Sequence, residues 1–571
     1  MPQVVKLHPL VVLLLAAILP SGVPAAEPPL HELIDQAIES RLTELKVPPA
    51  EIADDTEFLR RISLDLTGTI PTAAVARAFL ADSDPEKRTK LIDELLASDA
   101  FAARMATVFD VMLMERRPDK HVTTPEWRAW LAASFAENKP LDQLAAEILG
   151  ADGVDEKLRP AAKFYLDRDV DRDVLVQDIA RLFLGVNLQC AQCHDHPDIS
   201  DYLHRHYYGL AVFVSGSKPF RQPDGTTVLQ ENVLREVEYA SVFEPDKTHT
   251  TGPRLIEALL EVPEFEKGDE YVETPSRTVR AVPKFSLRQL LAERLPTSQT
   301  PEFSRNLANR LWALILGRGL VHPLDMHHSA NPPSHPALLE LLTSRLAESE
   351  FDCRGFLREL ALSRTYQRSS LLPENAAAAD IPEDSFAVAP LKALSPEQLF
   401  DNLLIATRAE PVLLRSIDQA LAADSTPAGD AGPDDKPEAS PEEAAAKLAE
   451  ARQAKRAETV AEFVTIFGSA AAQPEGEFSA SLPQALYLAN SEVVLSWVAP
   501  EKDNLTGQLA TFTEADQLAD ELYLSVFNRL PADEERQWVA EVLQQHRQNR
   551  SQGVATLVWS LIASAEFRLN H

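Results

Sequence analysis

Residues 58–71 read FLRRISLDLTGTIP, and residues 522–531, near the other end of the chain, read LYLSVFNRLP and line up with the last part of the first run. Each run precedes a helical pattern that closes on a related sequence, LLASDAF at 95–101 and LIASAEF at 561–567. Self-similarity of this kind predicts two copies of one helical hairpin near the two ends of the chain. Since there are only two copies, shared local preference for the same residues is the alternative explanation.

Apolar residues keep a helical spacing beyond the first copy as well. Between Leu30 and about Phe213 they recur mainly at intervals of three or four residues, as at Leu91 and Leu95. This spacing places one apolar stripe on each helix. It predicts an α-helical domain over residues 30–215.

The pattern changes in the middle of the chain. Residues 216–283 contain short β-branched runs, such as TTVL at 226–229 and RTVR at 277–280, broken by Pro, Gly and Asp. Such runs are typical of short strands and loops. Helical spacing then returns and predicts a second helical domain over residues 284–571. The predicted fold class is therefore mainly α, with two helical domains joined by a small strand-and-loop insert.

The second domain contains a segment that lacks bulky apolar side chains, at residues 422–440. Such a segment cannot bury enough surface to offset the entropy of the chain, so we predict a disordered acidic loop. Ser440 then precedes Pro441 and two glutamates, which predicts a helix from there to about Phe467. We interpret this helix, which is rich in Ala, Glu and Lys, as a solvated spacer.

The first residues of the chain are arranged like a secretory signal peptide. Lys6 is the only charged residue, an apolar run follows from Leu10 to Leu19, and small residues dominate 23–26. This order predicts a signal peptide over residues 1–25 and an exported protein of the periplasm or cell surface. The apolar run is shorter than the roughly 20 residues that a bilayer crossing requires. A permanent membrane anchor is therefore the less favoured alternative.

The composition is acidic, with 55 Lys and Arg against 87 Asp and Glu and a net charge of −32. A field of that sign repels nucleic acid and anionic lipid surfaces, so neither is predicted as a partner. The 3 cysteines are too few for a disulfide scaffold. We find no serine nucleophile elbow, no phosphate-binding glycine loop and no zincin motif in the sequence, so hydrolase chemistry has no local support.

Two of the cysteines belong to the most specific motif in the chain. Residues 190–194 read CAQCH, which in an exported protein is the attachment signature of c-type haem. In that role Cys190 and Cys193 bond the vinyl groups of the haem, and His194 supplies an axial nitrogen to the iron. The side chains able to supply a sixth ligand include Met105, Met112, Met114, Met326, His204, His206, His327 and His328.

Two other interpretations of the motif remain open. Cys190, Cys193, His194 and His196 are also suitable ligands for zinc or non-haem iron, and the additional His196 fits such a metal site better than haem. Alternatively, Cys190 and Cys193 form a disulfide and both histidines lie at the surface. Cys353 stands alone in the sequence and is predicted to be a buried, inert thiol.

A second polar cluster follows the predicted helical segment at 309–316. Gly317 predicts the end of a helix, and residues 322–335 then gather several His, Asp and Asn side chains. Such a loop is either a metal or substrate site or a set of capping and surface hydrogen bonds. We predict that the 190–196 site lies where the two helical domains meet, near this loop, because iron takes ligands on both faces and the loop is rich in imidazole.

Several of these motifs together resemble a family of planctomycete proteins in which a cytochrome-type domain (PSCyt) precedes a companion domain of unknown function (PSD). The segments that carry the resemblance are 58–71, 91–101, 190–197, 309–323, 331–336, 363–370 and 481–486. The resemblance implies an exported protein, and its members are often encoded beside sulfatase-like proteins in polysaccharide-degrading bacteria. Residues 198–204 depart from the family pattern, which puts any ligand from that stretch in doubt.

Three hypotheses of function follow, and none of them decides whether the protein is an enzyme. The first is haem or metal binding with electron transfer linked to polysaccharide catabolism, with redox or polysaccharide-degrading envelope proteins as partners. The second is a non-haem, metal-dependent enzyme or accessory factor in polysaccharide breakdown. The third is a structural or interaction protein of the envelope in which the cysteine motif is only a staple.

Overall fold

The computed structural model describes the residues 28–266, 268–374, 376–424, 441–473 and 481–570. The predicted signal peptide at 1–25 lies outside these ranges. Residues 422–424 of the predicted loop at 422–440 end a helix, and the rest of that loop lies outside the described ranges. Within those ranges, no helix is both long and apolar enough to cross a membrane.

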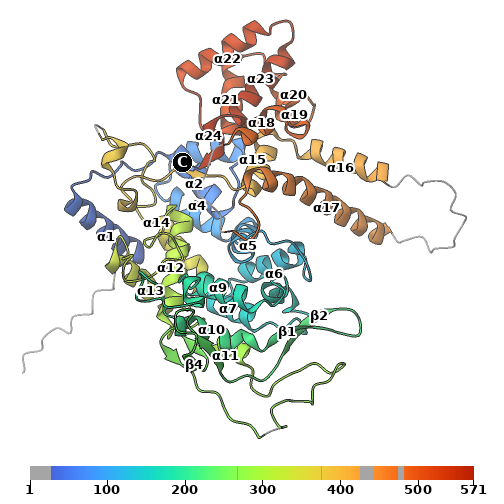
Figure 1. Cartoon of the computed structure of the whole chain (residues 1–571). Helices are drawn as coiled ribbons and strands as arrows, with labels where there is room; N and C mark the ends of the chain where they lie inside the picture. The colour runs from blue at the N-terminus through green and yellow to red at the C-terminus, as the bar shows by residue number, and fades with distance from the viewer. Residues whose placement is uncertain (1–27, 267, 375, 425–440, 474–480, 571) are drawn as a thin grey trace, which may run out of the picture.

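Helices make up the N-terminal part of the chain, as the apolar spacing predicted (Figure 1). Several of them start at a side chain that accepts from an otherwise free backbone amide, as Asp54, Thr72, Ser98 and Asp171 do. The elements are α1 (Leu30–Leu45), α2 (Asp55–Leu66), α3 (Ala73–Ala81), α4 (Lys87–Leu96), α5 (Asp99–Met114), α6 (Thr124–Ala136), α7 (Leu141–Gly150), η1 (Arg159–Ala162), α8 (Lys163–Leu166), α9 (Arg172–Phe183), η2 (Cys190–Gln192) and α10 (His204–Ser215).

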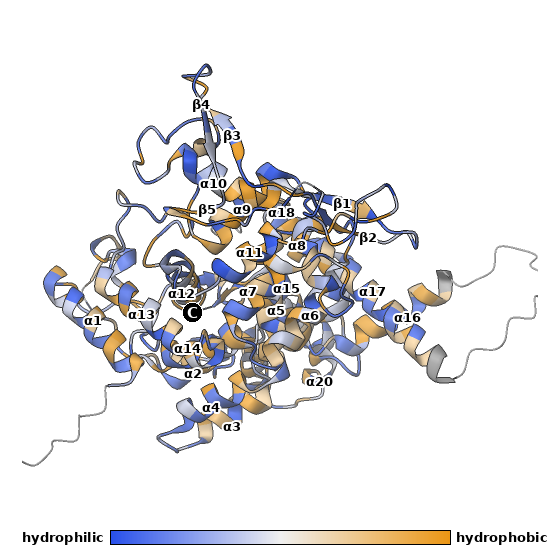
Figure 2. Ribbon diagram, turned by 90° about the horizontal axis from the view of Figure 1, so that it is seen from below, coloured by the Kyte–Doolittle hydropathy of each residue, from blue (hydrophilic) through white to orange (hydrophobic). Residues whose placement is uncertain are grey.

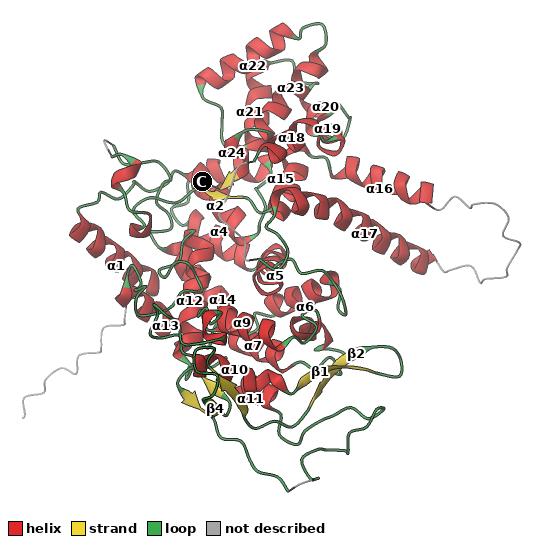
Figure 3. Cartoon of the chain, in the orientation of Figure 1, coloured by secondary structure: helices red, strands yellow, loops and turns green. Residues whose placement is uncertain are grey.

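The insert at 216–283 forms short two-stranded antiparallel hairpins (Figure 3). β2 confirms the strand predicted at 226–229. The run at 277–280 belongs to the loops of the insert, because the Ser276 hydroxyl oxygen accepts from the two backbone amides of Thr278 and Val279 and turns the chain there. The strands are β1 (Ser217–Arg221), β2 (Thr227–Glu231), β3 (Val237–Ala240), β4 (Thr248–Thr251), β5 (Arg254–Leu255) and β6 (Ala258–Leu259).

Helical structure resumes after the insert. Gly317 has a φ of 80° and its N–H bonds to the Ala313 carbonyl, so it ends α12 as predicted. The elements are α11 (Leu287–Arg294), α12 (Pro301–Leu316), α13 (Pro336–Glu348), α14 (Cys353–Leu362), η3 (Ala378–Asp380), η4 (Glu383–Ser385), β7 (Lys392–Ala393), α15 (Pro396–Thr407), α16 (Glu410–Asp424), α17 (Pro441–Phe467), α18 (Leu482–Asn490), α19 (Glu492–Val498), α20 (Leu505–Leu509), α21 (Ala515–Val526), α22 (Asp533–Gln545), α23 (Arg550–Ile562), α24 (Ala565–Arg568) and β8 (Leu569–Asn570).

α17 begins at Pro441 and ends at Phe467, which are the bounds that the sequence predicted. It lies beside α16, and the pair projects from the body of the molecule (Figure 1). The interpretation of α17 as a solvated spacer is wrong for its C-terminal half. Phe463 is fully buried and stacks on Trp497, and Arg456 forms ion pairs with carboxylates of α15 and α16.

The two copies of the predicted internal repeat share several local features in the structure. The order of elements is the same in both copies, α2, α3 and α4 in the first and α21, α22 and α23 in the second, and a residue with positive φ stands two positions after the end of the first helix. These residues are Gly68, at 78°, and Asn528, at 63°. Ser98 and Ser564 then accept from the backbone amide three positions further on and start the next helix. The two copies therefore match both at the turn after their first helix and at the serine that starts the helix after the repeat.

Two large hydrophobic cores and a small third cluster hold the described helices together. The larger one takes buried residues from 30 to 387, and thus from both predicted helical domains. The other lies mostly within 399–567 but includes Leu64 from α2 and Ile70 from the turn that follows. Figure 2 shows the apolar residues gathered on the inner helices, with the β3–β4 hairpin standing out beyond α10. The N-terminal hairpin is therefore shared by the two cores.

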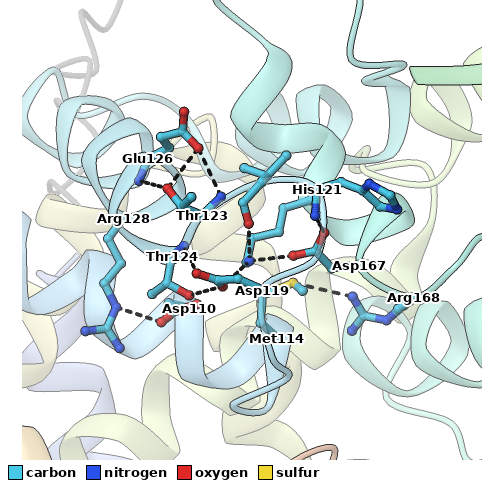
Figure 4. Close-up of polar contacts among 12 residues, drawn as sticks. Asp110, Met114, Asp119, His121, Thr123, Thr124, Glu126, Arg128, Asp167 and Arg168 are labelled. Atoms are coloured by element: carbon cyan, nitrogen blue, oxygen red, sulfur yellow. Dashed lines mark hydrogen bonds and ion pairs between the residues drawn. The ribbon is translucent and has the colours of Figure 1, made fainter. Parts of the chain in front are cut away.

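A buried ion network joins α8 to the loop before α6 (Figure 4). Lys163 is fully buried, and its Nζ lies 2.7 Å from Asp119 Oδ1, 2.6 Å from the Val122 carbonyl oxygen and 2.6 Å from Asp167 Oδ2. Asp167 also accepts from the backbone N–H of His121 at 2.9 Å. Each hydrogen of the ammonium group thus has an acceptor, which compensates for the loss of water around the charge.

His335, the residue before α13, is held neutral in the core. It is 6% exposed, and burial together with the positive charge of Arg41 lowers its pKa from 6.5 to about 4. The unfolded chain takes up this proton near pH 6.5, whereas the folded chain does so only near pH 4. The stability that depends on neutral His335 is therefore complete above pH 6.5 and is lost as the pH falls towards 4.

We expect the free energy of unfolding to fall by about 2 kcal/mol more in the unmodified protein than in His335→Gln when the pH drops from 7 to 5. Denaturant titrations of both proteins at the two pH values measure this difference. The same substitution at the exposed His249 is the control for replacing a histidine without removing a buried imidazole. Equal pH dependence in the His335 variant and the unmodified protein would contradict a buried neutral imidazole at this position.

Candidate functional site

Between α9 and the Cys-Ala-Gln-Cys-His motif, the backbone lies very close to the side chains of Asn306 and His327. Gly185 has a φ of 70°, and a Cβ there would lie 2.8 Å from both Asn306 Oδ1 and the His327 ring. Only glycine fits such a position. Val186 then forms a β-bridge to Met326. The segment before the motif is therefore anchored on the second helical part of the chain.

The motif forms one turn of 3-10 helix, η2. Ala191 is fully buried, whereas Cys190 and Cys193 are exposed, free thiols. Cys353 has the opposite surroundings, since it is buried in α14 and burial raises its pKa to about 12. A thiolate does not form at that position near neutral pH, so the structure confirms the prediction that Cys353 is buried and inert.

The ring of His194 has a defined orientation. Its Nδ1 lies 2.6 Å from the carbonyl oxygen of Asp195, which only accepts hydrogen bonds. Nδ1 therefore carries the proton, and Nε2 keeps its lone pair. This is the arrangement found in metal-ligating histidines, where a hydrogen bond from the other ring nitrogen fixes the tautomer.

The ring of His196 has the opposite tautomer to that of His194. Its Nδ1 accepts from the backbone amides of Asp198 and Ile199, at 3.1 and 3.0 Å, so the proton sits on Nε2. The ring thus holds the turn after the motif. Metal binding by His196 stays a prediction, and it requires the ring to give up either these two hydrogen bonds or its Nε2 proton.

Two neighbouring elements hold the motif loop in place. From α10, the backbone N–H of His204 bonds to the Asp195 carboxylate at 2.8 Å, and the Nε2 of its ring lies 3.2 Å from the Gln192 carbonyl oxygen. From the turn between β3 and β4, the backbone N–H of Val242 donates to the Cys193 carbonyl at 3.1 Å. The motif is therefore clamped between a helix and a hairpin.

The side chains considered as a sixth ligand differ in their surroundings. The ring of His206 is held between the Asp201 carbonyl and the Glu257 carboxylate, both near 3 Å. Met105 and Met114 are buried in the core. In the described part of the chain, no group of three or more His, Cys, Asp or Glu side chains is placed to hold a metal ion. The sixth ligand therefore stays a prediction.

The motif and the 322–335 loop approach each other through Tyr202. Its ring lies 6.0 Å from the ring of His196 on one side and 5.4 Å from that of His328 on the other. The Tyr202 hydroxyl donates to the His327 carbonyl at 3.1 Å. The two segments are thus neighbours, with a tyrosine between their imidazoles.

A cavity of about 420 Å³ opens beside this contact. It is lined by Tyr202 and Asp201 on one side and by His327 and Arg305 on the other. Burial and the charge of nearby Arg310 lower the pKa of His327 to about 3, so its imidazole is neutral. Sequence motifs missed Tyr202, and the only signal for it was the departure of residues 198–204 from the family pattern.

The fold and the site define a class of protein that is mainly α, with a CxxCH motif on its first helical part and an imidazole-rich loop of its second part packed beside it. Residues 33–218 match PSCyt2, a protein of unknown function (DUF1549), and residues 287–543 match PSD1, a protein of unknown function (DUF1553). Together they cover more than three quarters of the chain, so the chain belongs to the PSCyt2–PSD1 family. No curated protein and no solved structure matches it.

Proposed function

We propose that this chain is an exported cell-envelope protein that binds c-type haem and transfers electrons. Cys190 and Cys193 would hold the haem through thioether bonds, and His194 would ligate its iron. The orientation of the His194 ring carries the proposal, because the bond from Nδ1 to the Asp195 carbonyl leaves the Nε2 lone pair available to a metal.

The surroundings of the motif also fit covalent attachment of haem. The thioether bonds form at the edge of the macrocycle, so the two exposed thiols and the imidazole do not have to converge on one point. Val242 and Phe243, beside the motif, are 60% and 76% exposed, and the Phe243 ring lies 5.0 Å from that of His194. These apolar side chains offer a surface for a flat apolar group to cover. Bound haem supplies one-electron chemistry.

The location and the partners are part of the same proposal. The charged, apolar and small-residue order of residues 1–25 supports export to the periplasm or cell surface. The family resemblance supports redox or polysaccharide-degrading envelope proteins as partners. The acidic net charge of −32 argues against nucleic acid.

The test is expression of the whole chain, with its leader, in a bacterium that attaches c-type haem. We expect covalent haem on denaturing gels and a haemochrome spectrum of about one haem per chain. The double variant Cys190→Ala/Cys193→Ala should lose both signals. Cys353→Ala is the matched control, since it removes the third cysteine from a buried position, and it should keep them.

Other outcomes assign the site differently. Stoichiometric zinc or iron without porphyrin would overturn haem binding and favour the non-haem alternative, with Cys190, Cys193, His194 and His196 as ligands. A mass two hydrogens lower, with neither haem nor metal, would point to a Cys190–Cys193 disulfide and to a structural role.

A further inference from the structure

A second large cavity lies between α5, α9, α12 and the start of α15. Its volume is about 460 Å³, a size that suits a small organic ligand. α5 and α9 belong to the PSCyt2 part of the chain, and α12 and α15 to the PSD1 part. Neither domain forms this cavity alone.

The lining of this cavity is basic, although the whole chain has a net charge of −32. Five arginines, Arg104, Arg116, Arg181, Arg310 and Arg318, face three carboxylates, Glu115, Asp325 and Glu397. Three of the arginines are in ion pairs: Arg116 pairs with Glu397, Arg181 with Glu115, and Arg318 with Glu383. The other two carry the excess of positive charge.

Arg104 and Arg310 have no carboxylate partner within ion-pair distance in the described ranges. Arg310 donates to the Asn306 side-chain oxygen at 3.0 Å and to the Arg181 carbonyl at 2.8 Å, and both acceptors are uncharged. Asp325 attracts Arg310 without pairing with it. Asp65 and Glu397 attract Arg104 without pairing with it, and its buried Nε has no hydrogen-bond partner in the described residues. Cations that are removed from water without a directly paired counter-charge cost stability.

The turn that closes one side of the cavity is sterically specialised. A Cβ on Gly319 would lie 2.4 Å from the Val321 carbonyl oxygen and 2.6 Å from the Leu324 side chain. Gly317 needs positive φ, and a Cβ there would lie 2.6 Å from Pro390. The two glycines on either side of Arg318 therefore let the backbone fold tightly at the cavity wall.

We propose that this cavity binds a small organic oxyanion, with its charged group on Arg104 and Arg310 and its apolar body against the aliphatic wall. Guanidinium groups bind carboxylate, sulfate and phosphate oxygens through paired N–H donors. The wall comes from side chains such as Val108, Met112 and Leu314. This inference does not depend on haem binding, since the cavity shares no residue with the cysteine motif.

The test uses two fluorescent probes of nearly the same shape. Anilinonaphthalene sulfonate carries an anionic group on an aromatic body, and N-phenylnaphthylamine is the neutral counterpart. Both are titrated into the full chain, into Arg104→Met and into Arg310→Met. Arg235→Met is the matched control, because it removes an exposed, paired arginine of the insert. Competition with hexanoate, inorganic sulfate and inorganic phosphate then shows which oxyanion the cavity prefers.

We expect each of the two cavity variants to weaken sulfonate binding at least tenfold while binding of the neutral probe is kept. Arg235→Met should bind both probes like the unmodified protein. Arg104→Met should also melt at the same or a higher temperature, because a buried cation without a directly paired counter-charge is removed. A purely structural arginine would lower the melting temperature when replaced.

Two results would overturn the proposal. One is equal loss of sulfonate binding in Arg235→Met and in the cavity variants, which places the probe elsewhere. The other is unchanged sulfonate binding in Arg104→Met and Arg310→Met, which makes the cavity merely apolar. If Arg104→Met fails to fold, Arg310→Met decides between these results by itself.

Discussion

Replacing Lys163 by alanine is expected to lower the free energy of unfolding by about 3–5 kcal/mol. The side chains of Lys163 and Asp167 are both fully buried, with Nζ and Oδ2 2.6 Å apart. Without the ammonium group, the Asp167 carboxylate keeps a backbone amide as donor but has no counter-charge in the interior. The Val122 carbonyl also loses its donor. The large effect is thus the penalty of an uncompensated buried anion.

Denaturant unfolding followed by circular dichroism measures this loss. Lys120→Ala is the matched control, because Lys120 also pairs with an aspartate, Asp169, but the two side chains are 39% and 66% exposed. Water screens such a pair, and its removal should cost under about 1 kcal/mol. Similar losses in the two variants would show that burial of the Lys163 network has no energetic consequence.

Local sequence signals predicted most of the helical fold, because each depends on neighbouring residues. Ser440 and Pro441 located the start of α17, and Gly317 located the end of α12. A cap or a left-handed glycine acts within one turn of its own position, so its signal can be read without knowing the fold. The residue types at 277–280 suit a strand, but the structure has a loop there, because a serine one position earlier bonds two of its amides.

Contacts between segments that are distant in the chain could not be predicted from the sequence. Nothing local shows that Phe463 on α17 is buried against Trp497, so a helix rich in charged residues was interpreted as solvated. For the same reason, the sequence did not show that Leu64 and Ile70, from the N-terminal part of the chain, pack in the second core. Helical periodicity reveals that a face is apolar and does not reveal which element covers it.

In the candidate site, too, some features could be predicted from local sequence and others could not. The CxxCH spacing marked Cys190, Cys193 and His194, since covalent attachment requires residues adjacent in sequence. The proton positions on His194 and His196 depend on which backbone groups their rings meet, and only the structure shows these. The arginine-lined cavity has no motif, because its cations come from α5, α9 and α12.

The two copies of the repeat meet at Arg60, which is 1% exposed. Its Nη1 donates to the Val526 carbonyl and to Asn528 Oδ1, and its Nη2 donates to the Phe567 carbonyl, each at 3.1 Å. Burial lowers the pKa of Arg60 to about 10, so the guanidinium stays charged at neutral pH. One side chain of α2 thus bonds the end of α21, the turn after it and α24.

Arg60→Ala is therefore expected to destabilise the protein by about 3–5 kcal/mol, because three buried acceptors lose their donor and a large side chain leaves a cavity. The loss of stability should be confined to the region where the two copies of the repeat are in contact. In hydrogen exchange followed by mass spectrometry, amides of α21 and α24 should exchange faster, while those of α7 and α9, in the other core, should be unchanged. Arg77→Ala is the control, since Arg77 bridges the same two copies through Glu521 but is 54% exposed, so its removal should cost under about 1 kcal/mol. Faster exchange spread evenly over both cores would mean that Arg60 supports the whole fold and not this region.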